Sequence, residues 1–397
     1  MADAVIVDAV RSPMAKGKAT GELAGVHPVD LLAQVLTALV DRSGIDPATV
    51  DDVLVGCVSQ AGEQSSTPGR QAWLAAGYPT QVPSTTIERK CGSGQQAVEF
   101  ANSSIIAERY DIAVAAGIES MSRVPMGSAR MGADPFGPAV RARFPDLVPQ
   151  GVSAELVASR WQLSRAQLDE YSARSHELAD RARASGHFKR EIVPVEVPGA
   201  GSGTVVEADS TIRAGTTVEA LAGLPAVFES APYAARFPEI AEWMITAGNS
   251  SQLTDGAAAL LLMSGRRARE LGLRPRARIV ASSVCGDDPT LMLTGPIPAT
   301  HKVLARAGLS ITDMDAVEVN EAFASVPLAW QAEFGCDLAR LNPAGGAIAL
   351  GHPLGASGCR LMTSLLNHLE ASGGRYGLQT MCEAGGMANA TIIEILT

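Results

Sequence analysis

Short apolar runs alternate with amphipathic stretches along the first part of the chain. Ala4–Val10 is a β-branched run without clean alternation, which is typical of a strand buried on both faces. In Pro28–Ser43 the apolar residues recur at helical spacing, and Gly44 stands just past the end, where helices commonly stop. Val50–Val58 again has the pattern of a strand. This order predicts a strand, a helix and a second strand.

The same alternation continues to residue 117. Thr85–Glu88 is a short strand candidate, and Cys91-Gly-Ser-Gly94 precedes a helical segment with one apolar face. Ala113–Gly117 then closes the unit as another buried strand. Strands that alternate with helices predict a parallel sheet covered by helices.

The C-terminal part repeats this order of elements. Ala277–Ser282 corresponds to the first strand, and Gly308–Val319 corresponds to Gly44–Val55, both ending in a strand. Gly351–Leu369 corresponds to the earlier Gly-rich turn and helix, and Tyr376–Met381 to the closing strand. The predicted fold class is therefore α/β, with two similar halves packed together.

The region between the two halves does not follow the pattern. It contains several Pro-rich turns and a long amphipathic helix from about Ser164 to Ser185. Two strand-like runs follow, Ile192–Val197 and Thr204–Glu207, joined by the Gly-rich segment Pro198–Gly203. Because no helix follows that segment, we interpret it as a hairpin loop and not as a phosphate-binding loop.

The length of the chain supports more than one domain, since 397 residues exceed what one compact core usually takes. We expect an N-terminal α/β half at residues 1–118, completed by 248–270. A C-terminal α/β half is expected at 271–397. The irregular region 119–247 is expected to form an inserted loop domain that binds ligand.

Composition and charge narrow the classes of function. The 46% of hydrophobic residues exclude a disordered chain, and a net charge of −10 argues against a surface that binds DNA or RNA. The start of the chain lacks a basic region, so we expect no export signal. The long uncharged stretch Leu341–Cys359 contains five Gly and two Pro, which excludes a lipid-facing helix, and we expect no membrane segment.

The cysteines indicate a reduced protein. The six cysteines include no Cys-x-x-Cys pair, so neither a zinc cluster nor a disulfide framework is indicated. We therefore expect a cytoplasmic protein without a bound metal. In such a protein a single cysteine can serve as a chemical reagent.

Cys91 is the first candidate for such a role, because it lies directly before Gly-Ser-Gly and a predicted helix. A helix N-terminus favours thiolate over thiol. At the free pKa of about 8.5 only about 3% of a thiol is ionised at pH 7, and a decrease of about two units would make thiolate the major form. The alternative interpretation is a small buried residue on a tight turn, which is the commoner state of a lone cysteine.

Three further residues stand at positions suited to chemistry. His352 lies in a stretch dense in Gly, where the backbone can approach a ligand closely. Cys382 lies at the end of a predicted strand, an edge that faces the ligand crevice in open α/β sheets. Asn320 follows another strand and can hold a water or an oxyanion. Each signal is weak by itself, and a histidine in a loop or a cysteine in a core is an ordinary alternative.

Together these residues belong to a set of motifs through which the chain resembles the thiolase family over essentially its whole length. The matching motifs, in order, are Cys91-Gly-Ser-Gly94, Gly117-Ile-Glu-Ser-Met-Ser122, Thr246-Ala-Gly-Asn249, Asp255-Gly-Ala-Ala258, Gly295-Pro-Ile-Pro-Ala299, Asn320-Glu-Ala-Phe323, Gly351-His-Pro-Leu-Gly355 and Cys382. The resemblance implies a thiolase-like fold of two α/β halves with an inserted loop domain. It also implies thiolytic cleavage of 3-ketoacyl-CoA, or the reverse condensation of acetyl-CoA, through an acyl-cysteine intermediate.

The resemblance further implies roles for individual residues. Cys91, activated by His352, attacks and becomes acylated, and Cys382 acts as acid and base. Asn320 holds a water that polarises the thioester oxygen together with His352, and backbone N–H groups of Cys91 and Ala384 face the oxygen of the acyl-enzyme.

The resemblance also implies the binding partners. Coenzyme A and acyl-CoA are substrates, with no permanently bound cofactor. The pantetheine channel is expected at Ala247, Ser251, Ala322 and Phe323, with Met292 at the acyl end. Relatives of this family form dimers, often paired into tetramers, so a homodimer or homotetramer is expected.

The chain departs from the family pattern at several positions. Ala384 replaces the usual Gly, so the second oxyanion donor requires a negative φ there. Pro149-Gln150-Gly151 stands where short-chain biosynthetic thiolases carry His-Met-Gly or a similar tripeptide, which favours degradation over synthesis. Leu224 occupies the place of a basic residue near the adenine, and Tyr233–Trp243 has the look of an insertion. Specificity is thus the feature that the motifs define least.

Two other functions compete with this prediction. A decarboxylating ketosynthase generally uses Cys-His-His, and the Asn320 element together with Cys382 argues against it. A catalytically idle thiolase-like subunit, which binds lipid or scaffolds a partner, is disfavoured by the complete set of four residues. Ala384 keeps that second alternative open.

Overall fold

The computed structural model describes residues 3–199 and 203–396. Its main element is a ten-stranded sheet in the order β10-β11-β12-β9-β1-β8-β5-β3-β4, with the short β2 paired to β8. The strands of the N-terminal half are β1 (Ala4–Arg11), β2 (Ala15–Lys16), β3 (Asp52–Gly56), β4 (Ser84–Ile87), β5 (Ile112–Ser120) and β8 (Thr254–Ser264). Those of the C-terminal half are β9 (Ala277–Gly286), β10 (Ala316–Val319), β11 (Tyr376–Glu383) and β12 (Met387–Ile395).

The strand order shows that the two halves are built alike. From the middle outward, β1, β8, β5 and β3 on one side correspond to β9, β12, β11 and β10 on the other. The two parts meet through β1 and β9, which share only two residue pairs, Val5 with Arg278 and Ile6 with Ala277. The predicted repeat is confirmed by this order.

The sheet is mixed, so the expectation of an all-parallel sheet is wrong for its middle. β3 pairs in parallel with β4 and β5, and β10 pairs in parallel with β11. The pairs between β5 and β8, β8 and β1, β9 and β12, and β12 and β11 are antiparallel. The turn at 384–386 is too short for a parallel crossover, so β12 must return antiparallel to β11.

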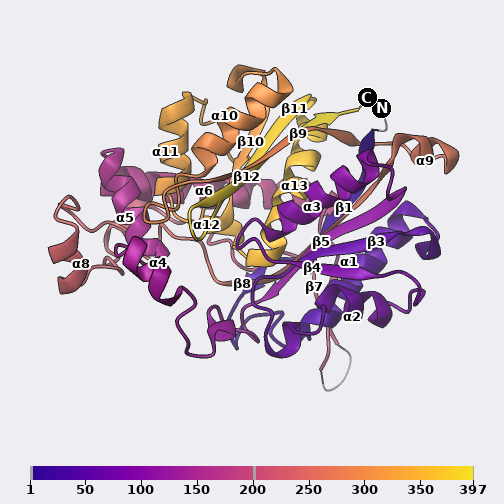
Figure 1. Cartoon of the computed structure of the whole chain (residues 1–397), viewed down its shortest axis with the longest axis horizontal. Coiled ribbons are helices and arrows are strands. Elements are labelled where there is room, and N and C mark those ends of the chain that lie inside the picture. Colours follow the sequence, from indigo (N-terminus) through magenta and orange to yellow (C-terminus); the bar gives the residue numbers. More distant parts are fainter. Residues whose placement is uncertain (1–2, 200–202, 397) are drawn as a thin grey trace.

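Helices pack on both sides of the two sheet parts (Figure 1). Two lie in the middle of the molecule and contact strands of both parts, α3 (Ser93–Ile106) and α13 (Leu354–Ser372). The outer face of the N-terminal part packs against α1 (Pro28–Ser43) and α2 (Pro68–Ala75). The outer face of the C-terminal part packs against α10 (Pro296–Ala307) and α11 (Ser325–Phe334).

Local signals explain the elements that the sequence predicts well. α1 has the predicted bounds because the His27 side chain accepts the N–H of Val29 at its start, and Gly44 ends it with φ 65°. β1 extends the predicted Ala4–Val10 by one residue. Ser164 and Gln167 form a capping box at the start of the long helix α6 (Arg165–Ala184).

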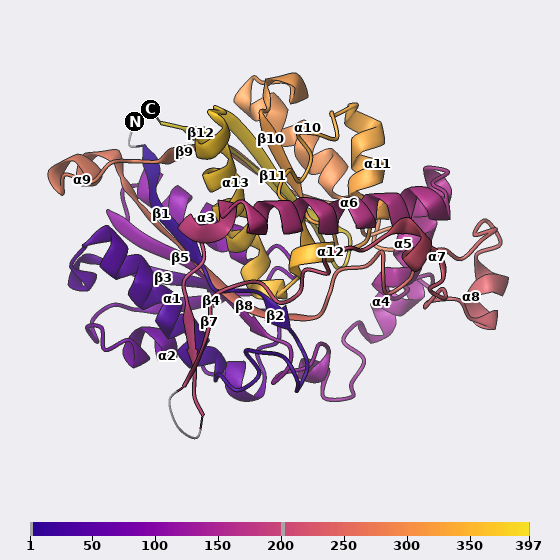
Figure 2. The same ribbon diagram turned by 180° about the vertical axis from the view of Figure 1, so that it is seen from behind.

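The region between the halves supplies most of the remaining elements. They are α4 (Gly137–Arg143), α5 (Gln150–Arg160), α6, α7 (Val218–Ala222), α8 (Ala231–Arg236) and the antiparallel hairpin of β6 (Val195–Val197) and β7 (Thr204–Val206). The predicted hairpin is confirmed by this pairing, while residues 200–202 of its loop lie outside the described residues. Figure 2 shows α6 running across the molecule, with α4, α5, α7 and α8 gathered at one end. Two short helices complete the fold, α9 (Gly265–Glu270) and α12 (Ala347–Leu350).

No helix in the described ranges is both long and apolar enough to cross a membrane.

Glycines allow the two middle helices to start directly on the strands of the N-terminal part. A Cβ on Gly355, at the start of α13, would lie 2.6 Å from the carbonyl oxygens of Gly56 and Ile118. A Cβ on Gly94, at the start of α3, would lie 2.7 Å from the carbonyl oxygen of Gly355. Real Cβ atoms do not approach so closely, so only glycine permits this packing. The starts of α3 and α13 are thereby brought together.

Candidate active site

Cys91 lies in the tight turn that joins β4 to α3. Lys90, directly before it, has φ 47°, and Gly92 is the N-cap of the helix. A non-glycine residue in the left-handed region is strained, and such strain often marks a functional turn. Cys91 is only 4% exposed. The turn thus presents a nearly buried sulfur at the start of a helix.

His352 lies between α12 and α13, and its ring is held in one tautomer. Its backbone N–H donates to the Gln252 carbonyl oxygen at 3.1 Å and to Thr254 Oγ1 at 3.0 Å. The Ser357 hydroxyl donates to the Pro353 carbonyl oxygen at 2.9 Å, and its oxygen lies 2.6 Å from His352 Nδ1. With the hydroxyl proton assigned to the Pro353 carbonyl oxygen, the proton of the short contact with Ser357 is assigned to Nδ1. Nε2 is then left with a lone pair and can act as a base.

Asn320 faces that lone pair. Its Nδ2 lies 3.4 Å from His352 Nε2. The Asn320 N–H donates to the Thr380 carbonyl oxygen at 3.1 Å, because β10 and β11 run in parallel, and this places Asn320 beside the end of β11 that carries Cys382. Asn320 Oδ1 is buried and has no hydrogen-bond partner among the described residues. It is therefore available to a water or to a substrate.

Cys91 and Cys382 are brought together by the residues that follow each of them. A Cβ on Gly92 would overlap the Glu383 carboxyl group, and Asn389 Nδ2 donates to the Gly92 carbonyl oxygen at 3.1 Å. Burial, and then the charge of Cys91, raises the pKa of Cys382. Cys382 is 1% exposed. The contacts thus pair His352 with Asn320 and link the turn of Cys91 to the residue after Cys382, while the Asn320–Thr380 hydrogen bond places Asn320 beside the strand of Cys382.

The electrostatics correct one expectation from the sequence. Burial, followed by the Glu383 charge, raises the pKa of Cys91 to about 12, although its own N–H and the Gln150 side chain oppose this. The decrease of about two units that would make thiolate the major form is therefore not found, because desolvation outweighs the helix dipole. Burial, and then the Arg360 charge, lowers the pKa of His352 to about 3. At neutral pH the Cys91 thiol and the His352 imidazole are therefore both neutral.

Ala384 adopts an ordinary backbone conformation. It is absent from the non-glycine residues with positive φ, and the left-handed positions of this turn fall on Gly385 (φ 91°) and Gly386 (φ 74°). The Ala384 N–H was expected to serve as the second oxyanion donor only if φ is negative at this residue. The structure meets that condition.

Four of the five residues predicted at the pantetheine channel and acyl end are grouped by contacts. The Ser251 N–H donates to the Ala322 carbonyl oxygen at 3.0 Å, and Phe323 forms a bridge with the neighbour of Ser251, residue 250. Ala322, Phe323 and Met292 belong to one apolar cluster, which also contains Cys382. Met292 has φ 30°. Ala247 lies exposed in the adjacent turn.

The structure adds two residues that the sequence reasoning did not single out. Ser357 lies against the His352 ring, with its oxygen 2.6 Å from Nδ1. Glu119 is fully buried and accepts N–H groups from three segments, including Gly355 at the start of α13. Glu119 is the residue that the sequence could have indicated, because it is a lone acid at the end of an apolar strand within a matching motif.

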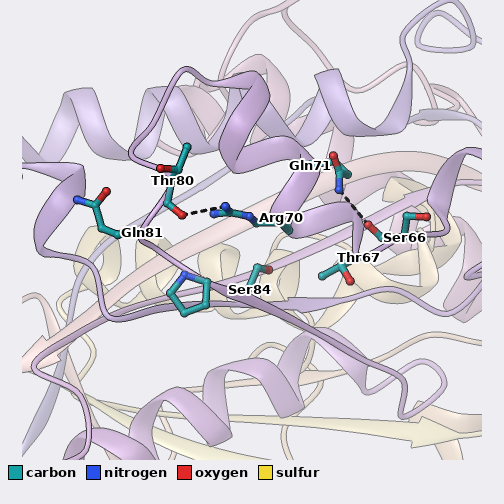
Figure 3. Close-up of a pocket in the computed structure, with 8 residues that line it drawn as sticks. Ser66, Thr67, Arg70, Gln71, Thr80, Gln81 and Ser84 are labelled. Carbon is teal, nitrogen blue, oxygen red and sulfur yellow. Dashed lines mark hydrogen bonds between the residues drawn. The ribbon is translucent and has the colours of Figure 1, made fainter.

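A separate surface hollow of about 370 Å³ lies between α2 and β4 (Figure 3). None of the predicted site residues lines it. Its one cation, Arg70, donates to the carbonyl oxygens of Thr80 and Val82 and so serves to hold the loop between α2 and β4. This hollow is distinct from the cysteine-histidine cluster.

Comparison with known proteins agrees with the geometry. Residues 4–266 match the thiolase N-terminal domain, and residues 273–395 match the thiolase C-terminal domain. The chain is 47% identical to a steroid 3-ketoacyl-CoA thiolase of Mycobacterium tuberculosis, over 100% of this chain and 95% of that protein. It is 42% identical to a beta-ketoadipyl-CoA thiolase of Acinetobacter baylyi, over 99% of this chain and 100% of that protein.

A solved structure shows the same fold. The crystal structure of the Bacillus anthracis acetyl-CoA acetyltransferase superposes with a TM-score of 0.89 at 37% identity, covering 100% of this chain and 99% of that chain. Two domain matches, full-length relatives and this superposition together settle the class of protein. The chain belongs to the thiolase family and is an acyltransferase that cleaves 3-ketoacyl-CoA by thiolysis or forms it by condensation.

Proposed function

We propose that this thiolase works through Cys91 as nucleophile, with His352 as its base. As the Cys91 sulfur attacks the 3-keto carbon, its proton passes to His352 Nε2, the ring nitrogen assigned no proton. The bond between C2 and C3 then breaks, and its electron pair moves onto C2 to form the enolate of acetyl-CoA. The acyl group remains as a thioester on Cys91. The observation that supports this assignment is the pair of contacts on the His352 ring, with Ser357 Oγ 2.6 Å from Nδ1 and Asn320 Nδ2 3.4 Å from Nε2.

Cys382 completes the proton transfers. Its thiol protonates the enolate carbon, and acetyl-CoA leaves. The Cys382 thiolate then takes the proton of the incoming CoA thiol, whose sulfur attacks the acyl group on Cys91. Cys91 leaves as a thiolate and regains its proton from His352. Burial raises the pKa of Cys382, which favours the protonated form that the first transfer needs.

Two sets of donors would stabilise the oxygen atoms that gain negative charge. Asn320 would hold a water beside His352 Nε2, and its unpartnered Oδ1 supports that role. Backbone N–H groups of Cys91 and Ala384 would face the oxygen of the acyl-enzyme. The ordinary φ of Ala384 supports this second site, and it also disfavours an idle subunit.

Coenzyme A would enter along the group formed by Ala247, Ser251, Ala322 and Phe323. The hydrogen bond from the Ser251 N–H to the Ala322 carbonyl oxygen, at 3.0 Å, holds the two backbone segments of this group side by side. The chemistry described above uses only side chains, backbone N–H groups and the two thioesters. We therefore propose that the enzyme needs no resident cofactor beyond its CoA substrates.

The preferred substrate is proposed to be a bulky apolar 3-ketoacyl-CoA, in the degradative direction. Next to α5 lies an apolar cluster in which Phe237 and Ile240, from the apparent insertion, pack with α5 residues. Phe228 joins this cluster and stacks edge to face on Phe323, with ring centroids 6.1 Å apart. The 47% identical relative is named as a steroid 3-ketoacyl-CoA thiolase, which agrees with an apolar acyl site.

A panel of 3-ketoacyl-CoA esters tests this preference, with loss of the enolate absorbance as the readout. We expect kcat/KM to increase from acetoacetyl-CoA to long and ring-bearing apolar esters, and to be low for an ester that ends in a carboxylate. A maximum at acetoacetyl-CoA would contradict the proposed substrate. Activity on a carrier-bound malonyl group without free CoA would instead indicate a ketosynthase.

Two substitutions test the residue roles. Cys91→Ala should abolish thiolysis and leave the fold unchanged, as measured by circular dichroism. Cys382→Ser should slow release of the enolate and attack of CoA more than it slows acylation of Cys91, as measured by rapid-quench kinetics. Full turnover by the first variant, or equal effects of the second on every step, would remove these assignments.

The enzyme is further proposed to be a cytoplasmic homodimer or homotetramer. β4 lies at one end of the sheet and pairs with β3 alone among the described strands, which leaves an edge that a second copy would cover. A reactive thiol needs a reducing compartment, and all six cysteines are free. Light scattering at low protein concentration tests the assembly, and a monomer would contradict it.

A further inference from the structure

The carboxyl group of Glu321, in the segment that follows β10, is fully buried and accepts four hydrogen bonds. Its Oε1 accepts from the Tyr171 hydroxyl at 3.0 Å and from Asn342 Nδ2 at 2.9 Å. Its Oε2 accepts from the Ser175 hydroxyl at 2.7 Å and from the Ile348 N–H at 3.0 Å. One side chain therefore connects the segment after β10 to α6 and to α12.

Asn342 holds the backbone on the other side of Asn320. Its Oδ1 accepts the Val319 N–H at 2.9 Å, and its Nδ2 donates to the Val319 carbonyl oxygen at 2.9 Å as well as to Glu321. Asn342 has φ 46°, and a strained residue of this kind persists where the surrounding contacts fix it. The residues directly before and directly after Asn320 are thus held by one buried network.

The same network reaches His352 through α12. Gly346, at the start of α12, lies so close to Glu321 that a Cβ would be 2.3 Å from the carboxyl carbon, and α12 lies beside α6 (Figure 2). Gln252 Nε2 donates to the Ile348 carbonyl oxygen at 2.9 Å, and the Gln252 carbonyl oxygen accepts the His352 N–H at 3.1 Å. The position of α12 is therefore linked to that of His352 by two hydrogen bonds.

We propose that Glu321 is a positioning residue that sets the spacing between Asn320 Nδ2 and His352 Nε2, which are 3.4 Å apart. Its carboxyl group is bonded to the segments that carry both side chains, and it neither touches substrate nor transfers a proton. A misplacement of 1 Å in a catalytic group can cost about a hundredfold in rate. This inference rests on the proposed function, in which Asn320 and His352 hold a water on the thioester oxygen.

The two halves of the reaction depend differently on this spacing. Cleavage of the bond between C2 and C3 places negative charge on the thioester oxygen of the departing enolate, where Asn320 and His352 act. Exchange of labelled CoA into a saturated acyl-CoA breaks no carbon–carbon bond. It transfers the acyl group to Cys91 and back, with the acyl oxygen facing the N–H groups of Cys91 and Ala384. A change in spacing should therefore slow cleavage and spare exchange.

His352 keeps its role as base when Glu321 is changed. Its N–H also donates to Thr254 Oγ1 at 3.0 Å, and Ser357 Oγ lies 2.6 Å from its Nδ1. Neither contact involves Glu321. Deprotonation of Cys91, which both halves of the reaction need, should thus continue at its normal rate.

The first test compares Glu321→Gln with the wild type. Glutamine keeps the shape of the side chain but turns one oxygen into a donor that faces donors such as the Ile348 N–H. We expect cleavage of a 3-ketoacyl-CoA, followed by loss of the enolate absorbance in a single turnover, to be slower by at least about tenfold. Exchange of labelled CoA should stay within about twofold, and KM should change little.

A pair of serines on α6 provides a matched comparison and decides the case if Glu321→Gln does not fold. Ser175 and Ser172 are both fully buried, but the Ser172 hydroxyl donates to the Leu168 carbonyl oxygen of its own helix at 2.7 Å. Ser175→Ala should slow cleavage by about threefold or more and leave exchange unchanged. Ser172→Ala should leave both rates unchanged.

The proposal is overturned if Glu321→Gln, or Ser175→Ala in its place, cleaves at the wild-type rate or slows cleavage and exchange equally. Asn320→Ala separates this outcome from a failure of the proposed function. If Asn320→Ala cleaves normally, the proposed water site itself is wrong. If Asn320→Ala slows cleavage alone while the Glu321 and Ser175 variants do not, only the role of Glu321 fails.

Discussion

Replacing Ser357 by alanine should slow acylation of Cys91, because it removes the group that fixes the tautomer of the catalytic imidazole. The Ser357 oxygen accepts the Nδ1 proton of His352 at 2.6 Å, and its own proton is used by the Pro353 carbonyl oxygen at 2.9 Å. Ser357 is fully buried, so no solvent replaces the lost oxygen. After the change, Nδ1–H has no acceptor there.

The size of the effect follows from the cost of that unpaired donor. A buried donor without a partner costs about 1–3 kcal/mol. The ring can avoid this cost by moving the proton to Nε2 or by rotating, and either change removes the base from the nucleophile. At 1.36 kcal/mol per factor of ten, we expect kcat to fall by about 5-fold to about 150-fold. KM should change little, because His352 does not hold the bulk of the substrate.

Rapid-quench measurement of acyl-Cys91 formation is the direct assay. Ser364→Ala is the matched control, because Ser364 lies on the same helix, is 2% exposed and donates to Glu191 Oε1 at 3.2 Å, away from the imidazole. It should lose some stability and keep its acylation rate. If Ser357→Ala acylates within about twofold of the wild type, or if both variants slow equally, the tautomer argument is refuted.

Three further outcomes are expected. Since burial lowers the pKa of His352 to about 3, kcat/KM should show no loss of activity near pH 6.5, and a titration there in the pH profile would contradict a neutral buried base. Burial raises the pKa of Glu383 from 4.5 to about 8, so the folded state binds this proton more tightly than the unfolded state does. The free energy of unfolding should therefore fall as the pH rises from 4.5 to 8, and urea unfolding at these two pH values should show a smaller fall for Glu383→Gln than for the wild type. Equal falls in the two proteins would be inconsistent with a buried neutral carboxyl. Gly355→Ala would place a Cβ 2.6 Å from the carbonyl oxygens of Gly56 and Ile118, so a decrease in Tm of several degrees or failure to fold is expected, and a wild-type melting curve would disprove the close packing.

Much of the fold could be predicted from sequence where a local pattern determines the element. Helix α1 and strand β1 were predicted with near-correct bounds, because apolar spacing and a terminal glycine act over a few residues. The joining of the two halves into one sheet could not be predicted, since only two residue pairs between β1 and β9 make it. Helices α4, α5 and α8 were also missed, because Pro-rich segments without a long apolar stripe give no clear period.

The candidate site likewise contains residues that could be predicted from sequence and contacts that could not. Cys91, His352 and Asn320 could be found from motifs, because the residue type itself carries the chemistry. The contacts of Asn320 with His352, and of Glu119 with Gly355, depend on tertiary packing and have no signal in sequence spacing. The sign of the Cys91 pKa shift was wrong for a related reason. A helix start is visible in sequence, whereas the depth of burial that outweighs it is not.

Glu119 connects the N-terminal half of the molecule to the start of α13 in the C-terminal half. Its carboxylate binds N–H groups at Val58 and Ser59, after β3, and at Gly355, where the helix behind His352 begins. One carboxylate therefore joins the end of β3 to the start of α13, which belong to different halves of the chain. Because the proposed acyl site draws on the inserted region as well as on Met292 and Phe323, exchange of residues 119–247 for those of a relative is expected to change the substrate range and leave Cys91, His352 and Cys382 in place.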